Sequence, residues 1–261
     1  MRLGKKQLLF MHEKKALPYS LISERLKFRL DAALVCQKAF GETSISWSPD
    51  GYFYLSRMPP EKDLNAYYST IYWEARGGKD LLVSSRDREH FLFLLEHAAE
   101  ALEPERKVLN FGAGHGGSSH LFWARGMRVT NIEPSDIPHS YKERWEQLAS
   151  IDQVQDVEKF DLIYGSHSLE HVSNLPLLYD YIKRILKKGG YIFWEVPNGN
   201  NPSNGGCNGQ VFVPHTYYFT RQFFRESADF EVVKNILIDD LRVHTDDEAK
   251  ANAIVYLGRR K

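Results

Sequence analysis

A glycine-rich loop that follows a short apolar run is the feature that most constrains this chain. The apolar run covers residues 107–111, and Gly112, Gly114 and Gly117 follow it with the spacing G-x-G-x-x-G. A loop with so few side chains lets a ligand approach the main chain closely. The pattern predicts a strand, a tight turn and a helix N-terminus, an arrangement that binds adenosine-containing cofactors. The glycines alone also fit a tight strand-to-helix turn without a ligand.

An acidic residue after a second apolar run strengthens the interpretation. The second run covers residues 129–132, and Glu133 follows it directly. An acid at this place, beyond the second strand of such a unit, is positioned to accept hydrogen bonds from two ribose hydroxyls. A solvent-facing acid at a strand end is the alternative. The loop and Glu133 together place an adenosine-containing cofactor at the carboxyl ends of two adjacent parallel strands.

The next segments continue the alternation of strands and helices. Residues 160–172 predict a strand, a polar strand end and a helix start. Residues 177–186 have the spacing of an amphipathic helix, and Lys187 to Gly190 predict a turn. A further apolar strand covers residues 191–196 and stops at Pro197. Strands that alternate with helices in this way predict a parallel sheet of the α/β class.

At this point the chain resembles the class I S-adenosylmethionine-dependent methyltransferases, within the broad group that acts on small molecules. The resemblance is carried by the glycine loop, Glu133, S-L-E-H-V at 168–172, L-K-K-G-G-Y-I-F-W-E-V-P-N at 186–198, and H-T-Y-Y-F-T at 215–220. It covers about residues 60–258. It implies a Rossmann-like, seven-stranded, mostly parallel sheet with an antiparallel last strand. Residues 231–238 and 252–258 resemble the sixth and seventh strands.

The resemblance also implies S-adenosylmethionine as the cofactor, and a set of residues that would bind it. The expected cofactor residues are Asn110, Gly112, Ala113, Gly114, Glu133, Pro134, Ser166, His167 and Tyr72. Relatives usually carry Asp or Glu at the position of Asn110, where the acid helps to orient the cofactor's ammonium group. Asn110 can still form a hydrogen bond but carries no charge. Tyr72 is expected to cover the methionine end of the cofactor.

The acceptor end is expected around two histidines. His167 ends the fourth strand, where the family faces the transferable methyl group, and His215 resembles the family's histidine after the fifth strand. Imidazole titrates near neutrality, so either residue is a candidate general base. The alternative for His215 is a structural hydrogen bond at the start of a following helix. Tyr217, Tyr218 and Asn198 are expected to contact the substrate, and the Asn- and Gly-rich residues 198–209 are expected to form a lid or substrate loop. No metal site is expected.

Residues 1–58 have no counterpart in the core pattern and are expected to form an N-terminal segment that covers the substrate side. Residues 17–39 have helical spacing, and residues 44–55 predict a β-hairpin that turns at Pro49-Asp50-Gly51. Residues 59–261 are expected to form the methyltransferase domain, with leading helices over 59–105 and the core over 106–261.

Charge and composition restrict the partners. Lys+Arg and Asp+Glu number 34 each, so the formal net charge is zero, and no basic field draws the chain to nucleic acid or to a membrane. No apolar run approaches the roughly 20 residues that span a bilayer. The two cysteines form no C-x-x-C pair, which fits a reducing, cytoplasmic location. The expected partner is a small-molecule acceptor, and the sequence leaves a homodimer open.

The predicted function is methyl transfer from S-adenosylmethionine to a small molecule, by O- or N-methylation of a sugar, nucleotide-sugar or related metabolite. Two alternatives stay open at this point. An NAD(P)-dependent oxidoreductase would use the same glycine pattern. A non-catalytic, methyltransferase-like scaffold protein would explain the missing acid at Asn110.

Overall fold

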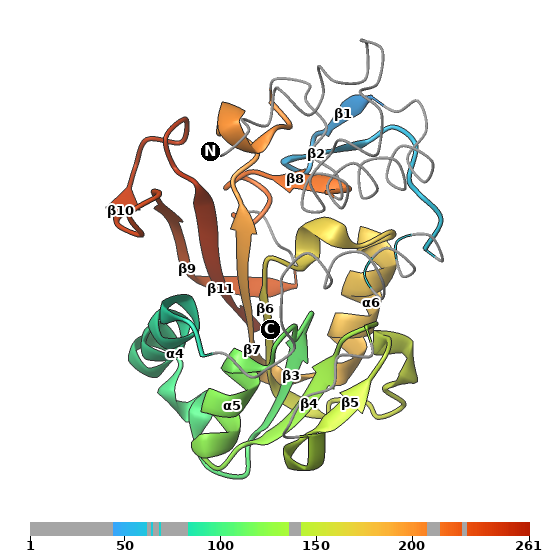
Figure 1. Ribbon diagram of the computed structural model, residues 1–261, viewed down its shortest axis with the longest axis vertical. Helices are drawn as coiled ribbons and strands as arrows, with labels where there is room; N and C mark the ends of the chain where they lie inside the picture. Colours follow the sequence, from blue (N-terminus) through green and yellow to red (C-terminus); the bar gives the residue numbers. More distant parts are fainter. Residues whose placement is uncertain are drawn as a thin grey trace, which may run out of the picture.

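Two β-sheets organise the chain in the computed structural model, which describes residues 44–61, 64, 68, 83–135, 142–207, 215–225 and 229–261. A large sheet has the strand order β10-β9-β11-β7-β6-β3-β4-β5, and a small sheet has the order β1-β2-β8 (Figure 1). The strands are β1 Ile45–Ser48, β2 Tyr52–Leu55, β3 Lys107–Phe111, β4 Arg128–Ile132, β5 Glu146–Leu148, β6 Phe160–Ser166, β7 Leu186–Pro197, β8 Tyr217–Phe219, β9 Phe230–Ile238, β10 His244–Thr245 and β11 Ala253–Arg260. The helices are α4 Ser85–His97, α5 Gly117–Ala124 and α6 Leu175–Ile185, and the 3-10 turns are η3 Ala99–Leu102, η4 Lys142–Arg144, η5 Ile151–Gln153, η6 Leu169–His171 and η7 Pro202–Asn204.

The large sheet has the predicted mostly parallel pairing. Strands β5, β4, β3, β6 and β7 pair in parallel, whereas β11 runs antiparallel to both of its neighbours, β7 and β9. The two-residue strand β10 extends the predicted seven strands by pairing with β9. The α/β class, the parallel sheet and the antiparallel last strand are therefore confirmed.

The order of the strands creates a crevice at one place. The chain winds from β3 to β4 and β5 on one side, then returns to place β6 and β7 on the other side of β3. In open α/β sheets, ligands bind beyond the carboxyl ends of the strands at such a reversal. The sheet therefore directs a ligand to the ends of β3, β4 and β6.

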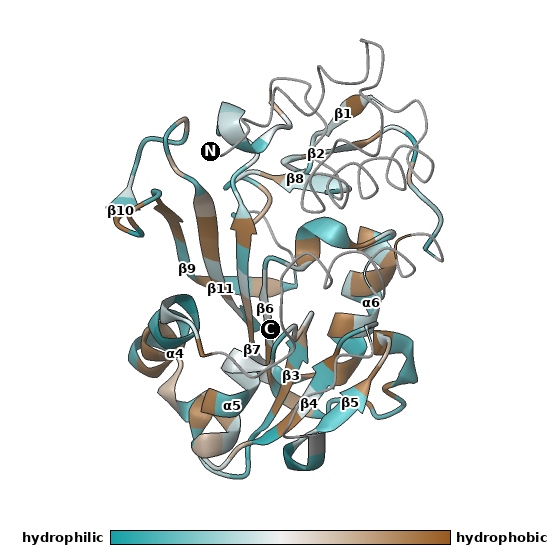
Figure 2. Ribbon diagram, in the orientation of Figure 1, coloured by the Kyte–Doolittle hydropathy of each residue, from teal (hydrophilic) through white to brown (hydrophobic). Residues whose placement is uncertain are grey.

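Neighbouring residues of the central strands pack on opposite faces of the large sheet. On β6, Leu162 belongs to the apolar cluster under α4 and α5, whereas Ile163 belongs to the cluster under α6. The same alternation separates Phe193 from Trp194 on β7. Period-two alternation between two covered faces is what a buried parallel sheet requires. The helices accordingly lie on both sides of the sheet (Figure 1), and hydrophobic residues run along its central strands (Figure 2).

Local signals set the ends of the helices close to their predicted positions. Helix α4 begins after Ser84, which forms a reciprocal capping box with Asp87, and α6 begins after Asn174, whose side chain caps the backbone of Leu177. Helix α4 ends at His97 and is followed by the 3-10 turn η3. The turn expected at residues 187–190 is wrong, because these residues form the start of β7, where the pairing with β6 shifts register.

The predicted hairpin is confirmed as β1 and β2, and it belongs to a sheet with a distant segment. Strand β2 pairs antiparallel with β8, and Thr220 Oγ1 donates a 2.7 Å hydrogen bond to the carbonyl of Gly51 at the hairpin turn. A bridge between Asn198 and Phe219 joins this small sheet to the end of β7. The hairpin of the N-terminal segment is thus built into the same body as residues 215–220. The helix expected over residues 17–39 lies outside the described residues.

Within the part of the chain that the structure describes, no helix is long and apolar enough to cross a membrane.

Candidate active site

A cavity of 980 Å³ lies at the carboxyl ends of β3, β4 and β6. Its wall contains the glycine loop, the end of β4, the polar end of β6, the first turns of α4 and α6, and His215. Of the residues expected to bind the cofactor, those that line it are Asn110, Gly112, Ala113, Gly114, Glu133, Pro134, Ser166 and His167. Tyr72 lies outside the described residues. The structure therefore brings the predicted cofactor residues to one site, at the strand reversal.

The glycine loop needs glycine where the chain approaches β6. Gly112 has φ 72°, and a Cβ atom at this position would lie 2.5 Å from the Cβ of Ser168. Gly114 and Gly116 also have positive φ values, of 53° and 75°. Left-handed backbone favours glycine because a side chain would meet the following carbonyl. The loop therefore keeps its main chain open toward the cavity, directly before α5.

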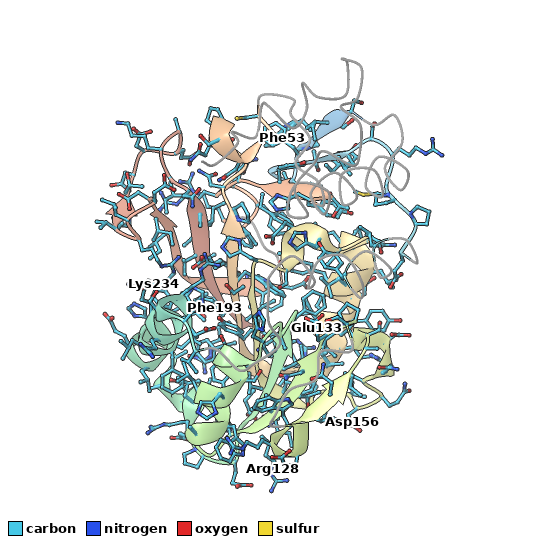
Figure 3. All side chains as sticks on the ribbon, viewed as in Figure 1. Phe53, Arg128, Glu133, Asp156, Phe193 and Lys234 are labelled. Carbon is cyan, nitrogen blue, oxygen red and sulfur yellow. The ribbon has the colours of Figure 1, made fainter. Side chains whose placement is uncertain are left out.

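Glu133 lies at the end of β4, facing the middle of the molecule (Figure 3). Its side chain is buried, and Oε2 accepts a 2.9 Å hydrogen bond from the backbone N–H of Gly114. Oε1 accepts hydrogen bonds from the backbone N–H of Ser135, at 3.1 Å, and from its hydroxyl, at 2.5 Å. Glu133 therefore holds the glycine loop against the end of β4, on the wall of the cavity.

Asn110 is held by neutral hydrogen bonds inside the protein. Its side-chain amide donates to Ser119 Oγ at 2.8 Å, and the Ser119 hydroxyl donates to Asn131 Oδ1 at 2.7 Å. All three residues are buried, and they join β3, α5 and β4. The buried amide therefore ties these elements together and brings no charge to the cavity.

His167 lies between two buried carboxylates at the end of β6. Its Nε2 is 3.0 Å from Glu195 Oε1, and its Nδ1 is 3.5 Å from Glu170 Oε1. The backbone of His167 has φ 51°, a conformation that is uncommon for a residue with a side chain. Burial lowers the pKa of His167, but the contacts with Glu170 and Glu195 outweigh this effect and raise it to about 8. Both ring nitrogens are therefore engaged by acids, and the ring carries a positive charge at neutral pH.

Glu195 is the centre of a buried group of charges that the sequence analysis missed. It lies on β7 with no exposed surface, and it contacts His90 as well as His167. The Arg242 guanidinium donates to it from Nη1 at 3.0 Å and from Nη2 at 2.7 Å. Burial would raise the pKa of Glu195, but the hydrogen bonds from His167, His90 and Arg242 hold it far below its usual range. An acid inside the apolar run Ile192–Val196 was the available signal, because acids are rarely buried without partners.

A second cluster joins Glu170 to two histidines on the cavity wall. Glu170, His171 and His215 each offer one ligand atom, and these atoms lie within 4.8 Å of one another. The rings of His171 and His215 are 5.0 Å apart, and Glu170 is 1% exposed. Burial raises the pKa of Glu170, but His171 and His167 outweigh it and lower the pKa to about 2. A carboxylate kept anionic beside imidazoles can stabilise a protonated histidine, and two histidines with one carboxylate could also hold a divalent metal.

The residues expected to contact substrate lie elsewhere among the described residues. Asn198, Tyr217 and Tyr218 are absent from the described wall of the cavity. Tyr217 packs in the core beside α6, where its hydroxyl accepts from the backbone N–H of Leu175, and Tyr218 packs against Leu55 in the small sheet. The substrate role of these residues stays a prediction, and their positions give it no support. His215 is followed by strand β8, so the helix start expected after it is wrong.

The described part of the Asn- and Gly-rich loop is held by its own side chains. The amide of Asn198 donates to the carbonyls of Glu248, at 2.7 Å, and Ala251, at 3.2 Å. The amides of Asn201 and Asn204 donate in the same way to carbonyls in residues 250–252. These hydrogen bonds fix the loop to the segment that precedes β11. Residues 198–207 therefore form a structural connection in this state, and residues 208–209 lie outside the described part.

The comparisons with known proteins agree on the family. Residues 84–234 match the model of a family described as a methyltransferase domain. The ubiquinone biosynthesis O-methyltransferase of Pseudomonas syringae pv. tomato is 27% identical over 106 residues, which cover 36% of this chain and 46% of that protein. The chain thus spans about half the length of the curated relatives it matches.

Two solved structures share the fold over most of the chain. The 1,6-didemethyltoxoflavin-N1-methyltransferase of Burkholderia thailandensis, solved with S-adenosylhomocysteine, has a TM-score of 0.57 and 16% identity, and covers 83% of this chain and 99% of its own. The geranyl diphosphate C-methyltransferase of Streptomyces coelicolor, also solved with S-adenosylhomocysteine, has a TM-score of 0.53 and 16% identity, and covers 95% of this chain and 100% of its own.

The family match excludes the oxidoreductase alternative and confirms the predicted resemblance: the chain belongs to the methyltransferase domain family and has the fold of the class I S-adenosylmethionine-dependent methyltransferases.

Proposed function

We propose that this protein transfers a methyl group from S-adenosylmethionine to an oxygen or nitrogen atom of a small molecule. The observation that carries the proposal is that a single cavity holds the glycine loop, Glu133 and the Glu170–His215 cluster. Its 980 Å³ is at the upper end of the range for ligand pockets, which suits a cofactor together with an acceptor. The bound cofactor would supply an electrophilic methyl group on a sulfonium sulfur.

The residues of the cavity fit an adenosine-containing cofactor. Glu133 places a carboxyl group on the cavity wall at the end of β4, where a ribose hydroxyl would donate to it. Gly112 packs so closely on Ser168 that a Cβ would lie 2.5 Å from the Ser168 Cβ. Residues 149–152, beyond β5, line the same side of the cavity as Glu133 and would border the adenine. The methionine end then extends past the glycine loop toward Ser166 at the end of β6. The first task of these residues is to align donor and acceptor and to exclude water.

His215 is the better placed of the two expected bases. His167 has both ring nitrogens engaged by Glu195 and Glu170, which leaves no nitrogen ready to accept a proton. His215 lines the cavity beside Glu170. A proton that leaves the acceptor's hydroxyl or amino group would move to a ring nitrogen of His215, and the Glu170 carboxylate would stabilise the resulting imidazolium.

We infer that the acceptor is a polar metabolite, with O-methylation of a sugar or nucleotide-sugar as the first case to examine. The serine- and asparagine-containing stretch at residues 166–174 lines the cavity and offers hydrogen-bond partners to a hydroxyl-rich acceptor. The curated relatives in Pseudomonas are O-methyltransferases, which supports oxygen over nitrogen.

The test is transfer of an isotopically labelled methyl group from S-adenosylmethionine to a panel of sugars, nucleotide-sugars and phenols. We expect a labelled product, and His215→Ala should lower turnover while cofactor affinity stays near normal. His97→Ala, on the far end of α4, is the matched control. Activity should survive dialysis against EDTA, because a histidine base needs no metal; loss of activity on chelation would instead indicate a metal in the Glu170 cluster. A folded protein that binds the cofactor without turning over any acceptor would favour the scaffold alternative.

A further inference from the structure

The missing charge at Asn110 raises the question of what balances the amino-acid end of the cofactor. S-adenosylmethionine ends in an α-ammonium and an α-carboxylate, so a site for it must present an acid and a hydrogen-bond donor or cation close together. Asn110 has a neutral side chain, and its amide is bound to Ser119 in the core. Among the described residues of the cavity wall, Arg86 and Asp87 are consecutive and of opposite charge.

Asp87 is fixed at the place where the glycine loop enters α5. Its Oδ1 accepts a 2.5 Å hydrogen bond from the hydroxyl of Ser118, in the first turn of α5. Its Oδ2 accepts from the backbone N–H of Ser84 at 2.8 Å and from the Ser84 hydroxyl at 2.6 Å. These bonds come from two helices and hold the carboxylate beside the loop. Oδ1 accepts one hydrogen bond and retains a lone pair for a ligand's ammonium group, whereas both lone pairs of Oδ2 are used by Ser84.

Arg86 lies one residue earlier, on the side of the cavity nearer β6 and β7. Its Nε is 3.4 Å from Glu195 Oε1, and its side chain is 46% exposed. This contact uses Nε alone, so the two terminal amino groups of the guanidinium are available for a planar carboxylate, which Arg binds with parallel hydrogen bonds. Arg86 is also in the first turn of the 13-residue helix α4, where the helix dipole favours an anion.

The strand order fixes which end of the cofactor reaches these residues. Glu133 follows β4 and would hold the ribose on one side of β3, so the remainder of the cofactor extends to the β6 side. Arg86 contacts Glu195, which in turn contacts His167 at the end of β6. Asp87 reaches the start of α5 from the same helix turn. Both side chains therefore stand around the position expected for the methionine end.

We propose that Arg86 and Asp87 bind the amino-acid end of the cofactor. Arg86 binds the cofactor's carboxylate, and Asp87 binds its ammonium group. This inference rests on the proposed function, because it presupposes S-adenosylmethionine as the ligand. Asp87 thereby supplies the negative charge that is absent at Asn110. The site then recognises both the zwitterionic amino-acid end of the ligand and its adenosine.

The test compares two ligands that share the adenosine and differ in the amino-acid end. S-adenosylhomocysteine carries that end, and 5′-methylthioadenosine lacks it. In calorimetric titrations, Arg86→Ala and Asp87→Asn should each lower the affinity for S-adenosylhomocysteine by about 10- to 100-fold. This is the usual effect of losing a hydrogen bond to a charged group. Both variants should bind 5′-methylthioadenosine as the unaltered protein does. Arg88→Ala, an exposed position in the same helix turn outside the described cavity wall, should change neither affinity.

Four results would overturn the inference. Equal losses for both ligands would mean that the substitutions disturb the fold or the adenosine site. Unchanged affinity for S-adenosylhomocysteine would remove Arg86 and Asp87 from the cofactor site. If the unaltered protein binds 5′-methylthioadenosine but not S-adenosylhomocysteine, no amino-acid subsite exists. If the unaltered protein binds neither ligand, the cofactor assignment itself is overturned, and this inference with it.

Discussion

His167 and Glu195 are joined twice across the neighbouring strands β6 and β7. The backbone N–H of His167 donates to the carbonyl of Glu195 at 2.8 Å, and its ring Nε2 lies 3.0 Å from the Glu195 carboxylate. The backbone bond extends the parallel ladder by one residue and fixes the left-handed His167 at the end of β6. The side-chain bond then sets the charge of a histidine at the wall of the cavity. The pair therefore links the geometry of the sheet to the electrostatics of the site.

Glu195→Gln should lower the pKa of His167, because the amide keeps a hydrogen bond but removes the negative charge. The pKa should fall from about 8 toward its usual value. Titration of the histidine ring signals by NMR measures this directly. Glu89→Gln is the matched control, because Glu89 contacts Arg242 and is not a neighbour of His167. A His167 pKa that does not move in Glu195→Gln would show that Glu195 does not set its charge.

The stabilising effect of His167 should depend on pH. Folding raises its pKa from about 6.5 to about 8, so its contribution is complete below the lower value and is lost as the pH rises through the upper one. The difference in unfolding free energy between the unaltered protein and His167→Asn should shrink by about 1–2 kcal/mol between pH 6 and pH 9. Asn is chosen because it tolerates left-handed backbone. Urea denaturation at the two pH values measures it, and a constant difference would contradict the prediction.

Glu133→Gln should weaken binding of S-adenosylhomocysteine by about 1–3 kcal/mol, because a charge-assisted bond to the ribose becomes a weaker one. Glu133 also holds the backbone of Gly114, so the amide is preferred to alanine as the replacement. Glu105→Gln, which alters an exposed acid paired with Arg128 at the opposite end of the strands, is the control. Equal affinities of the two variants, measured by calorimetry, would take Glu133 out of the cofactor site.

Gly112→Ala should destabilise the protein and abolish measurable cofactor binding. The new Cβ would lie 2.5 Å from the Cβ of Ser168, and the backbone has φ 72°. Gly126→Ala separates the strain of the left-handed backbone from the steric clash with Ser168. Gly126 has a φ of 89°, but a Cβ there would come no closer than 3.3 Å to Pro104. We expect about 1–2 kcal/mol of destabilisation from the strained backbone at Gly126, with cofactor binding intact. Normal binding by a folded Gly112→Ala protein would argue against close packing of the loop on Ser168.

Local patterns in the sequence were enough to predict that the glycine loop and Glu133 meet at one site. The glycine loop and Glu133 each follow a strand directly, so the strand order alone brings them together. The buried charges around Glu195 depend on contacts between distant segments. Glu195 is paired with Arg242 from the turn after β9 and with His90 from α4, and neither spacing has a periodic signature in the sequence.

The positions of two tyrosines also depend on distant contacts. Tyr217 and Tyr218 follow His215 and were expected beside the substrate, but they belong to β8, whose pairing with β2 buries both side chains. The sequence contains the hairpin signal and the apolar tyrosines separately. It has no local pattern that pairs a hairpin at residues 45–55 with a strand at 217–219. Long-range strand pairing of this kind is decided by packing, which the sequence of either segment alone does not specify.

Calorimetric titration with S-adenosylmethionine and S-adenosylhomocysteine, with NAD and NADP as controls, tests the central claim most directly. Binding of the first two ligands alone, each at one site per chain, is the result that the cavity predicts. Binding of NAD or NADP in their place, or binding of none of the four by the folded protein, would contradict the assignment of this cavity to S-adenosylmethionine.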